Sequence, residues 1–416
     1  KRKRKFFLTT SLIANIGVLA IFKYYNFIND NITLLLHGIH QQNPMPFLSI
    51  LLPVGLSFHT FQAMSYTIEV YRRNQAAEKN FGIYSLYVMF YPQLVAGPIE
   101  RPQNLLHQFR EQHQFDADNF YIGFKHMLWG MFKKVVIADR LAILVNQVYN
   151  HPHEHNATML VIASVFFAIQ IYCDFSGYSS IAIGAARTMG FTLMQNFDNP
   201  YSARSINEFW KRWHISLSTW FRDYVYIPLG GNRRGKFRHI LNLMLVFMLS
   251  GIWHGASWTF VIWGALHGMF LVFGLLTAPA RDSIRLFFSR RWLDKVFTVL
   301  SILFVFHLVS FAWIFFRANT VSDAFIIISK LTSGWEKLPV IISQLTTLKL
   351  GTFELGLVFF MILLMEIFHT WLRKGNVFEN LRQRPAWQRW GVYYLICGTI
   401  VLFGKFDSQQ FIYFQF

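Results

Sequence analysis

The sequence predicts an all-α, polytopic integral membrane protein, and three observations lead to this fold class. Hydrophobic residues make up 54% of the 416 residues and charged residues only 14%, whereas soluble domains carry about 25% charged residues. Lys and Arg number 39 against 21 Asp and Glu, which gives a net charge of +18. The basic residues cluster in short runs between apolar stretches near the roughly 20 residues that a helix needs to cross a bilayer. A water-soluble globule is therefore not expected.

The excess of positive charge fits either a nucleic-acid-binding surface or the positive-inside asymmetry of a membrane protein. Its division into short runs between apolar segments favours the lipid bilayer, and no nucleic-acid partner is expected. Two cysteines, Cys173 and Cys397, lie inside apolar runs and predict no disulfide framework. The chain begins at Lys1 without Met, and we expect that an upstream portion has been removed.

Six apolar stretches predict membrane-spanning helices: 6–28, 46–68, 157–186, 296–316, 352–372 and 388–404. A longer stretch, 119–148, mixes charged residues with apolar ones. We expect its first half at the membrane interface and its second half across the membrane. No internal repeat or low-complexity tract is visible, so residues 1–416 are predicted to form a single domain.

Loops that hold Lys and Arg are expected on the cytoplasmic side. The basic segments are 1–5, 72–79, 204–238, 281–295 and 373–389. The loop 29–46 has no Lys or Arg, and it is expected outside together with the loop 149–156 and the C-terminus. With these assignments, two stretches must enter and leave the membrane on the same side: 81–98 and 240–278.

Both of these stretches contain residues that interrupt a helix. Pro92, Gly97 and Pro98 fall in the first, and Gly251 and Gly255 fall in the second. Broken backbone at membrane depth is found only where protein or a water-filled cavity surrounds it, so re-entrant segments here indicate a functional site. The alternative is a pair of short, tilted helices that pack through their glycines.

His254 is the first candidate for a catalytic residue, because an ionisable side chain in a membrane segment indicates function by default. Gly251 and Gly255 leave room for other groups beside it, and His267 follows thirteen residues later. An imidazole in an apolar segment is expected to be neutral and able to take a proton from a hydroxyl. The alternative is a histidine that forms a hydrogen bond between two helices.

His214 is the second candidate. It lies in the segment 207–228, where aromatic and charged residues alternate as they do in helices that lie along a membrane interface. From such a segment its side chain can face inward. An interfacial anchor with a structural histidine explains the pattern equally well.

A glycine-rich basic turn follows, with Gly230 and Gly231 before the cations Arg233, Arg234 and Lys236. Guanidinium groups and exposed backbone N–H groups bind phosphates, so the turn is a candidate for the phosphates of a nucleotide cofactor. It lacks the GK[ST] of a P-loop. Positive-inside topology alone also accounts for these cations.

One further cluster resembles a metal-binding tract: His151, His153, Glu154 and His155. It lies in a short loop without a second ligand set nearby in the sequence. We therefore predict no metal site.

The chain also carries seven distinctive runs: PVGLSFHTFQAMSYTIEVYR (53–72), FYPQLVAGPIERP (90–102), LWGMFKKVVIADRLA (128–142), QIYCDFSGYSSIAIGAARTMGF (170–191), NEFWKRWHISLSTWFRDYVYIPLGGNRRG (207–235), SGIWHGASWTFVIWGALHG (250–268) and the terminal FIYFQF. In order and spacing these runs resemble the bacterial membrane-bound O-acyltransferases of the alginate O-acetyltransferase type, whose relatives serve peptidoglycan. The resemblance extends over most of the chain.

This resemblance implies a ring of transmembrane helices, re-entrant segments and a central tunnel from a cytoplasmic donor site to an extracytoplasmic acceptor site. It implies that His254 is the catalytic residue and His214 its partner. The expected donor is acetyl-CoA, with Arg233, Arg234 and Lys236 attracting its phosphates. Members usually begin with further hydrophobic helices, which are expected upstream of this chain.

The acceptor that the resemblance implies is a polysaccharide outside the bacterial inner membrane, of the alginate or peptidoglycan type. It is reached directly or through a separate periplasmic acetyltransferase of the SGNH type. Two other functions stay open. A transporter or flippase also contains broken helices and buried ionisable residues, and a related acyltransferase takes its acyl group from a carrier protein.

Overall fold

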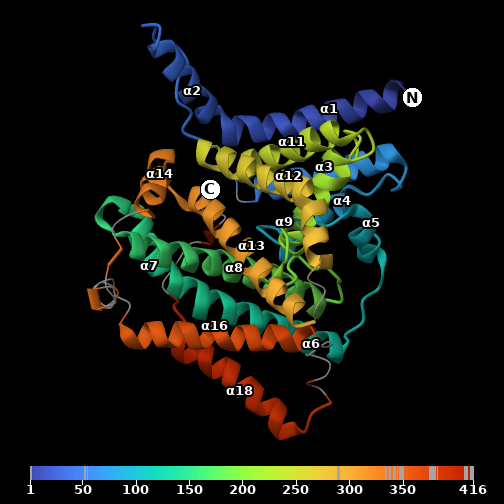
Figure 1. The fold of residues 1–416 in the computed structure, drawn as a ribbon. Helices are drawn as coiled ribbons and strands as arrows, with labels where there is room; N and C mark the ends of the chain where they lie inside the picture. The colour runs from blue at the N-terminus through green and yellow to red at the C-terminus, as the bar shows by residue number, and fades with distance from the viewer. Residues whose placement is uncertain are drawn as a thin grey trace.

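The computed structural model describes residues 2–50, 53, 55–287, 291–332, 335–336, 339–340, 343, 345, 351–373, 381, 383–406 and 411–412. Within these ranges every regular element is a helix (Figure 1), which confirms the all-α class. The predicted basic segments 281–295 and 373–389 and the terminal run FIYFQF lie partly outside the described residues.

The longer elements of the first half of the chain are α1 (Arg2–Leu19), η1 (Ala20–Tyr24), α2 (Tyr25–His37), α3 (Leu56–Arg72), α4 (Phe81–Met89), α6 (Ala117–Met131), η4 (Phe132–Ala138), α7 (Asp139–Asn150) and α8 (Ala157–Thr188). Those of the second half are α9 (Ile206–Arg212), α10 (Ile215–Phe221), η7 (Arg222–Tyr226), α11 (Lys236–His254), α12 (Trp258–Phe287), α13 (Arg291–Arg317), α14 (Val321–Lys330), α16 (Thr352–Arg373) and α18 (Ala386–Phe403). Short helical turns connect some of them: η2 (Tyr91–Gln93), α5 (Pro102–Leu105), η3 (Gln108–Arg110), η5 (Pro152–Glu154) and η6 (Pro200–Ser202).

Five helices in the described part of the chain are long and apolar enough to cross a bilayer: Arg2–His37, Ala157–Thr188, Trp258–Arg281, Leu293–Arg317 and Phe353–Thr370. Together they indicate a multi-pass membrane protein. Protein covers them unequally, since 72% of the apolar window is buried in α8 but only 6% in the first helix. The helix α8 is thus a central element, while the first helix leaves its apolar surface free for lipid.

The predicted span 46–68 is wrong in its start. The helix α3 begins only at Leu56, because Gly55 adopts a left-handed conformation with φ of 76°. A Cβ atom at Gly55 would lie 2.5 Å from the carbonyl oxygen of Leu94. This close approach requires glycine at the start of α3.

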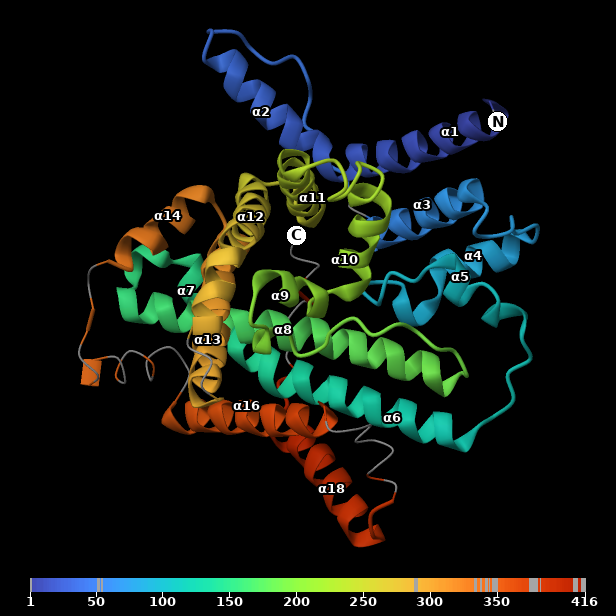
Figure 2. The ribbon, with the colours of Figure 1, turned by 45° about the vertical axis from the view of Figure 1, so that its right-hand side comes forward.

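The centre of the fold is an antiparallel pair formed by α6 and α8, which lie side by side in Figure 2. Two glycine contacts bring their backbones together, Gly123 against Gly184 and Gly130 against Gly177. Small residues at such positions let membrane helices approach closely. The helix α6 continues through the π-helical η4 into α7, so the predicted stretch 119–148 is helical throughout.

The region 240–278 forms a hairpin of two helices, α11 and α12, of 19 and 30 residues. The backbones of the two helices touch at Gly251 and Gly264, as the alternative with packing glycines expects, but neither helix is short. That the stretch enters and leaves the membrane on the same side stays a prediction. The other irregular stretch, 81–98, contains the nine-residue α4 and then a short turn of helix.

The later helices enclose this centre. The helix α13 packs against both α8 and α12. The helices α16 and α18 pack against η4, and both lie along the edge opposite α1 in Figures 1 and 2. The hairpin and α13 therefore form one wall of a compartment whose other wall is α9 and α10.

Candidate functional site

His254 is the last residue of α11, where the hairpin turns. The turn needs glycine at position 255, because a Cβ atom there would overlap the ring of Phe260. Gly255 is extended, with φ of −163°, and ends the helix. The first predicted histidine therefore stands at a fixed helix end, between two helices that are held in contact by glycines.

Aromatic rings surround the imidazole of His254, which is only 5% exposed. Ring centroids lie at 4.9 Å for Trp253, 5.0 Å for Trp263 and 5.3 Å for Phe316, all in edge-to-face geometry. Edge-to-face contacts of this kind fix the plane of a ring. The side chain is thus held in one orientation by the aromatic rings around it.

His214 lies between α9 and α10 in a left-handed conformation, with φ of 43° and ψ of 56°. This region is sparsely populated by residues other than glycine. Asn196 holds the strained joint, since its side-chain Oδ1 accepts hydrogen bonds from the backbone N–H and the hydroxyl of Ser216, at 3.2 and 2.9 Å. The backbone carbonyl of Asn196 accepts from Ile215 N–H at 2.9 Å.

The imidazole of His214 is fully buried and reaches the same aromatic cluster. Its ring lies 4.6 Å from Phe175 of α8 and 6.2 Å from Trp253. The Trp253 indole therefore contacts both candidate histidines. The structure brings together two residues that lie forty positions apart in the sequence and belong to different helices.

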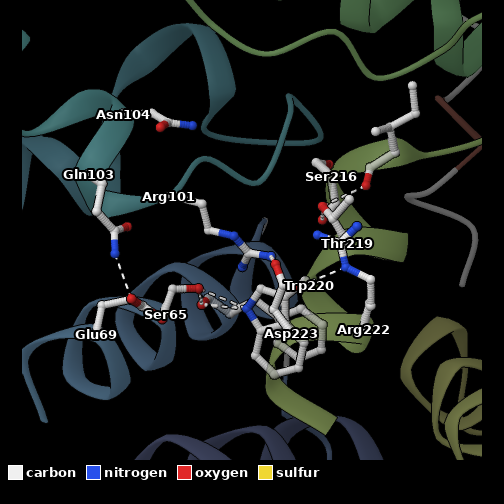
Figure 3. Close-up of polar contacts among 12 residues, drawn as sticks. Ser65, Glu69, Arg101, Gln103, Asn104, Ser216, Thr219, Trp220, Arg222 and Asp223 are labelled. Carbon is white, nitrogen blue, oxygen red and sulfur yellow. Dashed lines mark hydrogen bonds and ion pairs between the residues drawn. The ribbon is translucent and has the colours of Figure 1, made fainter. Parts of the chain in front are cut away.

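The segment that carries His214 is fastened to α3 and α5 by polar contacts (Figure 3). The Trp220 indole donates to the hydroxyl of Ser65 at 2.8 Å, and the guanidinium of Arg101 pairs with Asp223 at 3.1 Å. Phe61 stacks on the Trp220 indole with a centroid distance of 3.9 Å. These contacts make α10 and η7 a fixed wall.

That wall encloses a cavity of about 950 Å³ between α9, α10, α11, α12 and α13. Buried residues line its inner part, among them Trp210, Val246 and Ser250. Its exposed lining combines cations with large apolar side chains: Arg204, Lys211, Arg222 and Arg281, and Phe273, Leu300 and Phe304. The cavity is thus apolar within, and its open side carries both cations and apolar groups.

The inner end of the cavity approaches His254. Its lining includes Ser250, one helical turn before His254. Trp210, another lining residue, lies 5.8 Å from Trp263, and Trp263 lies 5.0 Å from His254. The Trp210 indole also donates to Nδ1 of the fully buried His267 at 3.3 Å. Two aromatic rings therefore separate the cavity from the candidate catalytic histidine.

The predicted phosphate-binding residues Arg233, Arg234 and Lys236 are exposed on the turn before α11. They are absent from the lining of this cavity as far as the structure describes the chain. Their turn lies beside it, because a Cβ atom at Gly231 would lie 3.4 Å from the ring of Tyr226, a lining residue. The phosphate-binding role of the turn stays a prediction.

An ion cluster includes Asp174, the residue before Phe175, whose ring packs against His214. Lys134 pairs with Asp139 at 2.7 Å and with Asp174 at 2.8 Å. The Asp174 carboxylate also accepts a hydrogen bond from the backbone N–H of Ile412 at 2.8 Å. The segment 411–412 therefore lies in the middle of the molecule, where Phe411 packs 6.2 Å from Phe175.

The histidine cluster of the loop 149–156 forms no such compact site. His151, His153 and Glu154 are exposed. Among the residues that the structure describes, no group of three or more His, Cys, Asp or Glu is placed to hold a metal ion.

Several residues of the site were not singled out from the sequence. Asn196 and Trp263 carry no local motif, and the cavity cations Arg204 and Arg222 look like any other residues of a basic segment. One missed residue, Lys23, does carry a signal, because it is a lone charge within the apolar stretch 6–28. A charged side chain inside a membrane is energetically unfavourable unless it has polar partners.

Comparisons with known proteins agree with this picture. The model of the membrane-bound O-acyltransferase family matches residues 72–317, which include both candidate histidines. A probable alginate O-acetylase of Azotobacter vinelandii is 39% identical over 357 residues, which are 84% of this chain and 68% of that protein. A peptidoglycan O-acetyltransferase of Helicobacter pylori is 33% identical over 347 residues, 77% of this chain and 63% of that protein.

A more distant relative is a teichoic acid D-alanyltransferase of Bacillus subtilis, 28% identical over 294 residues, which are 67% of this chain and 72% of that protein. The chain thus spans about two thirds of the length of the alginate and peptidoglycan relatives.

Proposed function

The chain belongs to the membrane-bound O-acyltransferase family, and from that premise we propose that it transfers acetyl groups from acetyl-CoA in the cytoplasm toward a polysaccharide outside the bacterial inner membrane. One observation carries the proposal: two buried histidines share the Trp253 indole, and two aromatic rings separate His254 from the inner end of a cavity whose open side carries cations. Such an arrangement suits a thioester that enters from one side and a hydroxyl that enters from the other.

In the proposed reaction, His254 is the general base. It takes the proton of the attacking hydroxyl while the hydroxyl oxygen forms a bond to the carbonyl carbon of the thioester. The carbon–sulfur bond then breaks, and the proton passes from the imidazolium to the leaving thiolate. Base catalysis of this kind typically contributes about 10² to 10⁴-fold in rate.

His214 is proposed to orient the acceptor hydroxyl or to donate a hydrogen bond to the developing oxyanion. Its fixed position supports this role, because Asn196 and Ser216 hold its backbone and Phe175 holds its ring. Preorganised donors stabilise the transition state without having to reorganise. A loosely held histidine would lose that advantage.

The cavity is the proposed donor site. Its apolar interior suits the pantetheine arm, and the exposed cations Arg204, Lys211 and Arg222 suit phosphates. The predicted residues Arg233, Arg234 and Lys236 would add to the positive field from the neighbouring turn. In this arrangement the phosphates bind at the open side of the cavity and the acyl group points toward His254.

The acceptor is proposed to be a polysaccharide of the alginate or peptidoglycan type, as the names of two relatives suggest. A separate periplasmic acetyltransferase of the SGNH type is the proposed partner for final delivery, as the resemblance to the family implies. The C-terminus is proposed to lie outside.

The test uses the purified protein in lipid vesicles with acetyl-CoA and oligosaccharides prepared from alginate or peptidoglycan. We expect release of CoA, and acetylation of the sugar directly or once the periplasmic partner acetyltransferase is added, with loss of both in His254→Ala. The control His307→Ala removes an exposed histidine of α13 and is expected to retain the native rate. Native activity of a folded His254→Ala protein would refute the proposal.

Two further arms separate the other functions. An acetylated acyl carrier protein that replaces acetyl-CoA and supports a higher rate would indicate the carrier-dependent reaction. Movement of a substrate across the vesicle membrane without consumption of any thioester would indicate a transporter.

A further inference from the structure

Lys23 occupies an unusual place for a lysine. It lies in η1, a π-helical turn within the long apolar helix Arg2–His37, and it is half-buried. A charged side chain in such a helix is costly unless it meets polar partners. π-helical turns of this kind often mark functional sites.

Both hydrogen bonds of Lys23 that the structure defines end at the backbone beside the candidate catalytic residue. Its ammonium donates to the carbonyl oxygens of Trp253 and His254, each at 2.9 Å. The next residue, Tyr24, donates from its hydroxyl to the carbonyl oxygen of Ile252 at 2.8 Å. Two consecutive residues thus reach the last turn of α11 together.

These contacts complete the hydrogen bonding of the helix end. The last four carbonyl groups of an α-helix have no partner within the helix, and in α11 they belong to residues 251–254. Gly255 N–H satisfies the carbonyl of Gly251 at 3.4 Å. The other three carbonyls are those that Lys23 and Tyr24 satisfy. The ammonium also opposes the negative end of the helix dipole.

The same long helix holds the other side of the hairpin turn. Asn31 of α2 accepts a hydrogen bond from the Trp258 indole at 2.9 Å, and Phe27 packs on that indole at 5.9 Å. Trp258 is the first residue of α12. The helix Arg2–His37 therefore contacts both ends of the break that carries His254.

We propose that Lys23 is a positioning residue for catalysis, which caps the end of α11 and thereby holds His254 in its reactive orientation. This inference rests on the proposed role of His254. Without the ammonium, two carbonyls at the hairpin turn lose their partner, and the last turn of α11 is free to shift. A displacement of about 1 Å at a reacting group costs on the order of 10²-fold in rate.

The proposal predicts a specific kinetic signature. Lys23→Met keeps the length of the side chain and removes the cation, and we expect kcat to fall about 10- to 100-fold while KM for acetyl-CoA stays unchanged. Lys23→Arg keeps a cationic donor and is expected to retain most of kcat. Tyr24→Phe removes one of the three cross-helix hydrogen bonds and is expected to have a smaller effect in the same direction.

Matched controls separate positioning from general stability. Lys330 donates to three carbonyls, those of Pro152, His153 and His155, at a loop remote from the hairpin turn. Tyr25 donates to Pro46 instead of α11. Lys330→Met and Tyr25→Phe are expected to keep the native kcat, even if Lys330→Met lowers the unfolding temperature.

Three results would overturn the proposal: an unchanged kcat in Lys23→Met, an increase in KM alone, or an equal loss in Lys23→Met and Lys23→Arg. Should Lys23→Met fail to fold, Lys23→Leu, which also removes the donor, takes its place under the same criteria. His254→Ala is measured in parallel. Activity in His254→Ala refutes the proposed function, whereas loss in His254→Ala with native kcat in Lys23→Met refutes only the positioning role.

Discussion

Gly251 and Gly264 touch through their backbones, so that a Cβ atom at either residue would lie 3.2 Å from the Cα atom of the other. This contact joins α11 to α12 one turn before His254. Each added Cβ would also overlap a backbone carbonyl, that of Phe260 or Phe247. The geometry of the hairpin therefore depends on the absence of side chains at these two positions.

Gly264→Ala is expected to force the two helices apart. Overpacking of this kind typically costs about 1 to 3 kcal/mol, and the shift would move Trp263 away from the His254 ring. We expect a lower unfolding temperature together with a lower kcat. Gly356→Ala is the control, because a Cβ atom there meets open space; a similar loss in this control would contradict the explanation.

Two substitutions at His214 separate the role of the imidazole from the effect of backbone strain. His214→Gly removes the buried imidazole but suits the left-handed backbone, so acetyl transfer is expected to fall, and the unfolding temperature is expected to fall less than in a variant that keeps a Cβ atom. His214→Val also removes the imidazole, and its branched side chain adds strain of about 1 to 2 kcal/mol. Thermal unfolding of both variants checks the difference, and equal stability would argue against strain at this joint.

The cations at the open side of the cavity predict an effect on donor binding. In a double variant, Arg204→Gln and Arg222→Gln, KM for acetyl-CoA is expected to rise about 10-fold, since a charge-assisted hydrogen bond contributes about 1.5 to 3 kcal/mol and exposure weakens it. The rise should be smaller with acetyl-pantetheine, which lacks the nucleotide phosphates. Lys79→Gln, an exposed cation outside the cavity, is the control. Equal changes with both donors would exclude phosphate contacts at the open side.

Filling the cavity provides a test that does not involve charge. Ser301 of α13 lines the cavity, whereas Leu303 on the same helix is 48% exposed and does not. Ser301→Trp is expected to lower kcat/KM for acetyl-CoA at least 10-fold, since an indole occupies space that a bound ligand needs. Leu303→Trp should be neutral. Steady-state kinetics of both variants decide whether the donor uses this space.

The stability of the folded protein is expected to depend on pH through His155, in the loop after α7. Burial lowers the pKa of His155 below its ordinary value, and the nearby Lys330 ammonium also lowers the pKa. A histidine with a lowered folded-state pKa stabilises the fold in its neutral form. That contribution is fully present above the unfolded pKa of about 6.5 and is lost as the pH falls below it. Thermal unfolding at pH 7.5 and 5.0 should show a smaller loss in His155→Gln than in the native protein.

Much of the architecture was predictable because the membrane imposes simple rules on sequence. Apolar length predicted the helices around 157–186 and 296–316, whereas the return of 240–278 to the same side of the membrane stays a prediction from loop charge. The helix start at Leu56 was missed, since the contact between Gly55 and the Leu94 carbonyl joins residues far apart in the sequence. Apolar composition near 46–55 does not reveal such a contact.

For the site, the sequence indicated which histidines to consider but not what holds them. The WHG and RWH runs pointed to His254 and His214. Their common contact with Trp253, and the support from Asn196, arise from tertiary packing that no local pattern records. The cavity cations differ from the predicted Arg233, Arg234 and Lys236 for the same reason, because charge alone does not tell which basic residues face a cavity.

The hydrogen bond from Ile412 to the buried carboxylate of Asp174 joins residues 238 positions apart. During synthesis, α8 is complete long before residue 412 is made. The cluster of Lys134, Asp139 and Asp174 therefore forms with one acceptor still unfilled. An unsatisfied acceptor of this kind costs several kcal/mol in hydrocarbon. The cluster therefore carries this cost until residue 412 is synthesised, and a chain that ends before that residue would keep the acceptor unfilled.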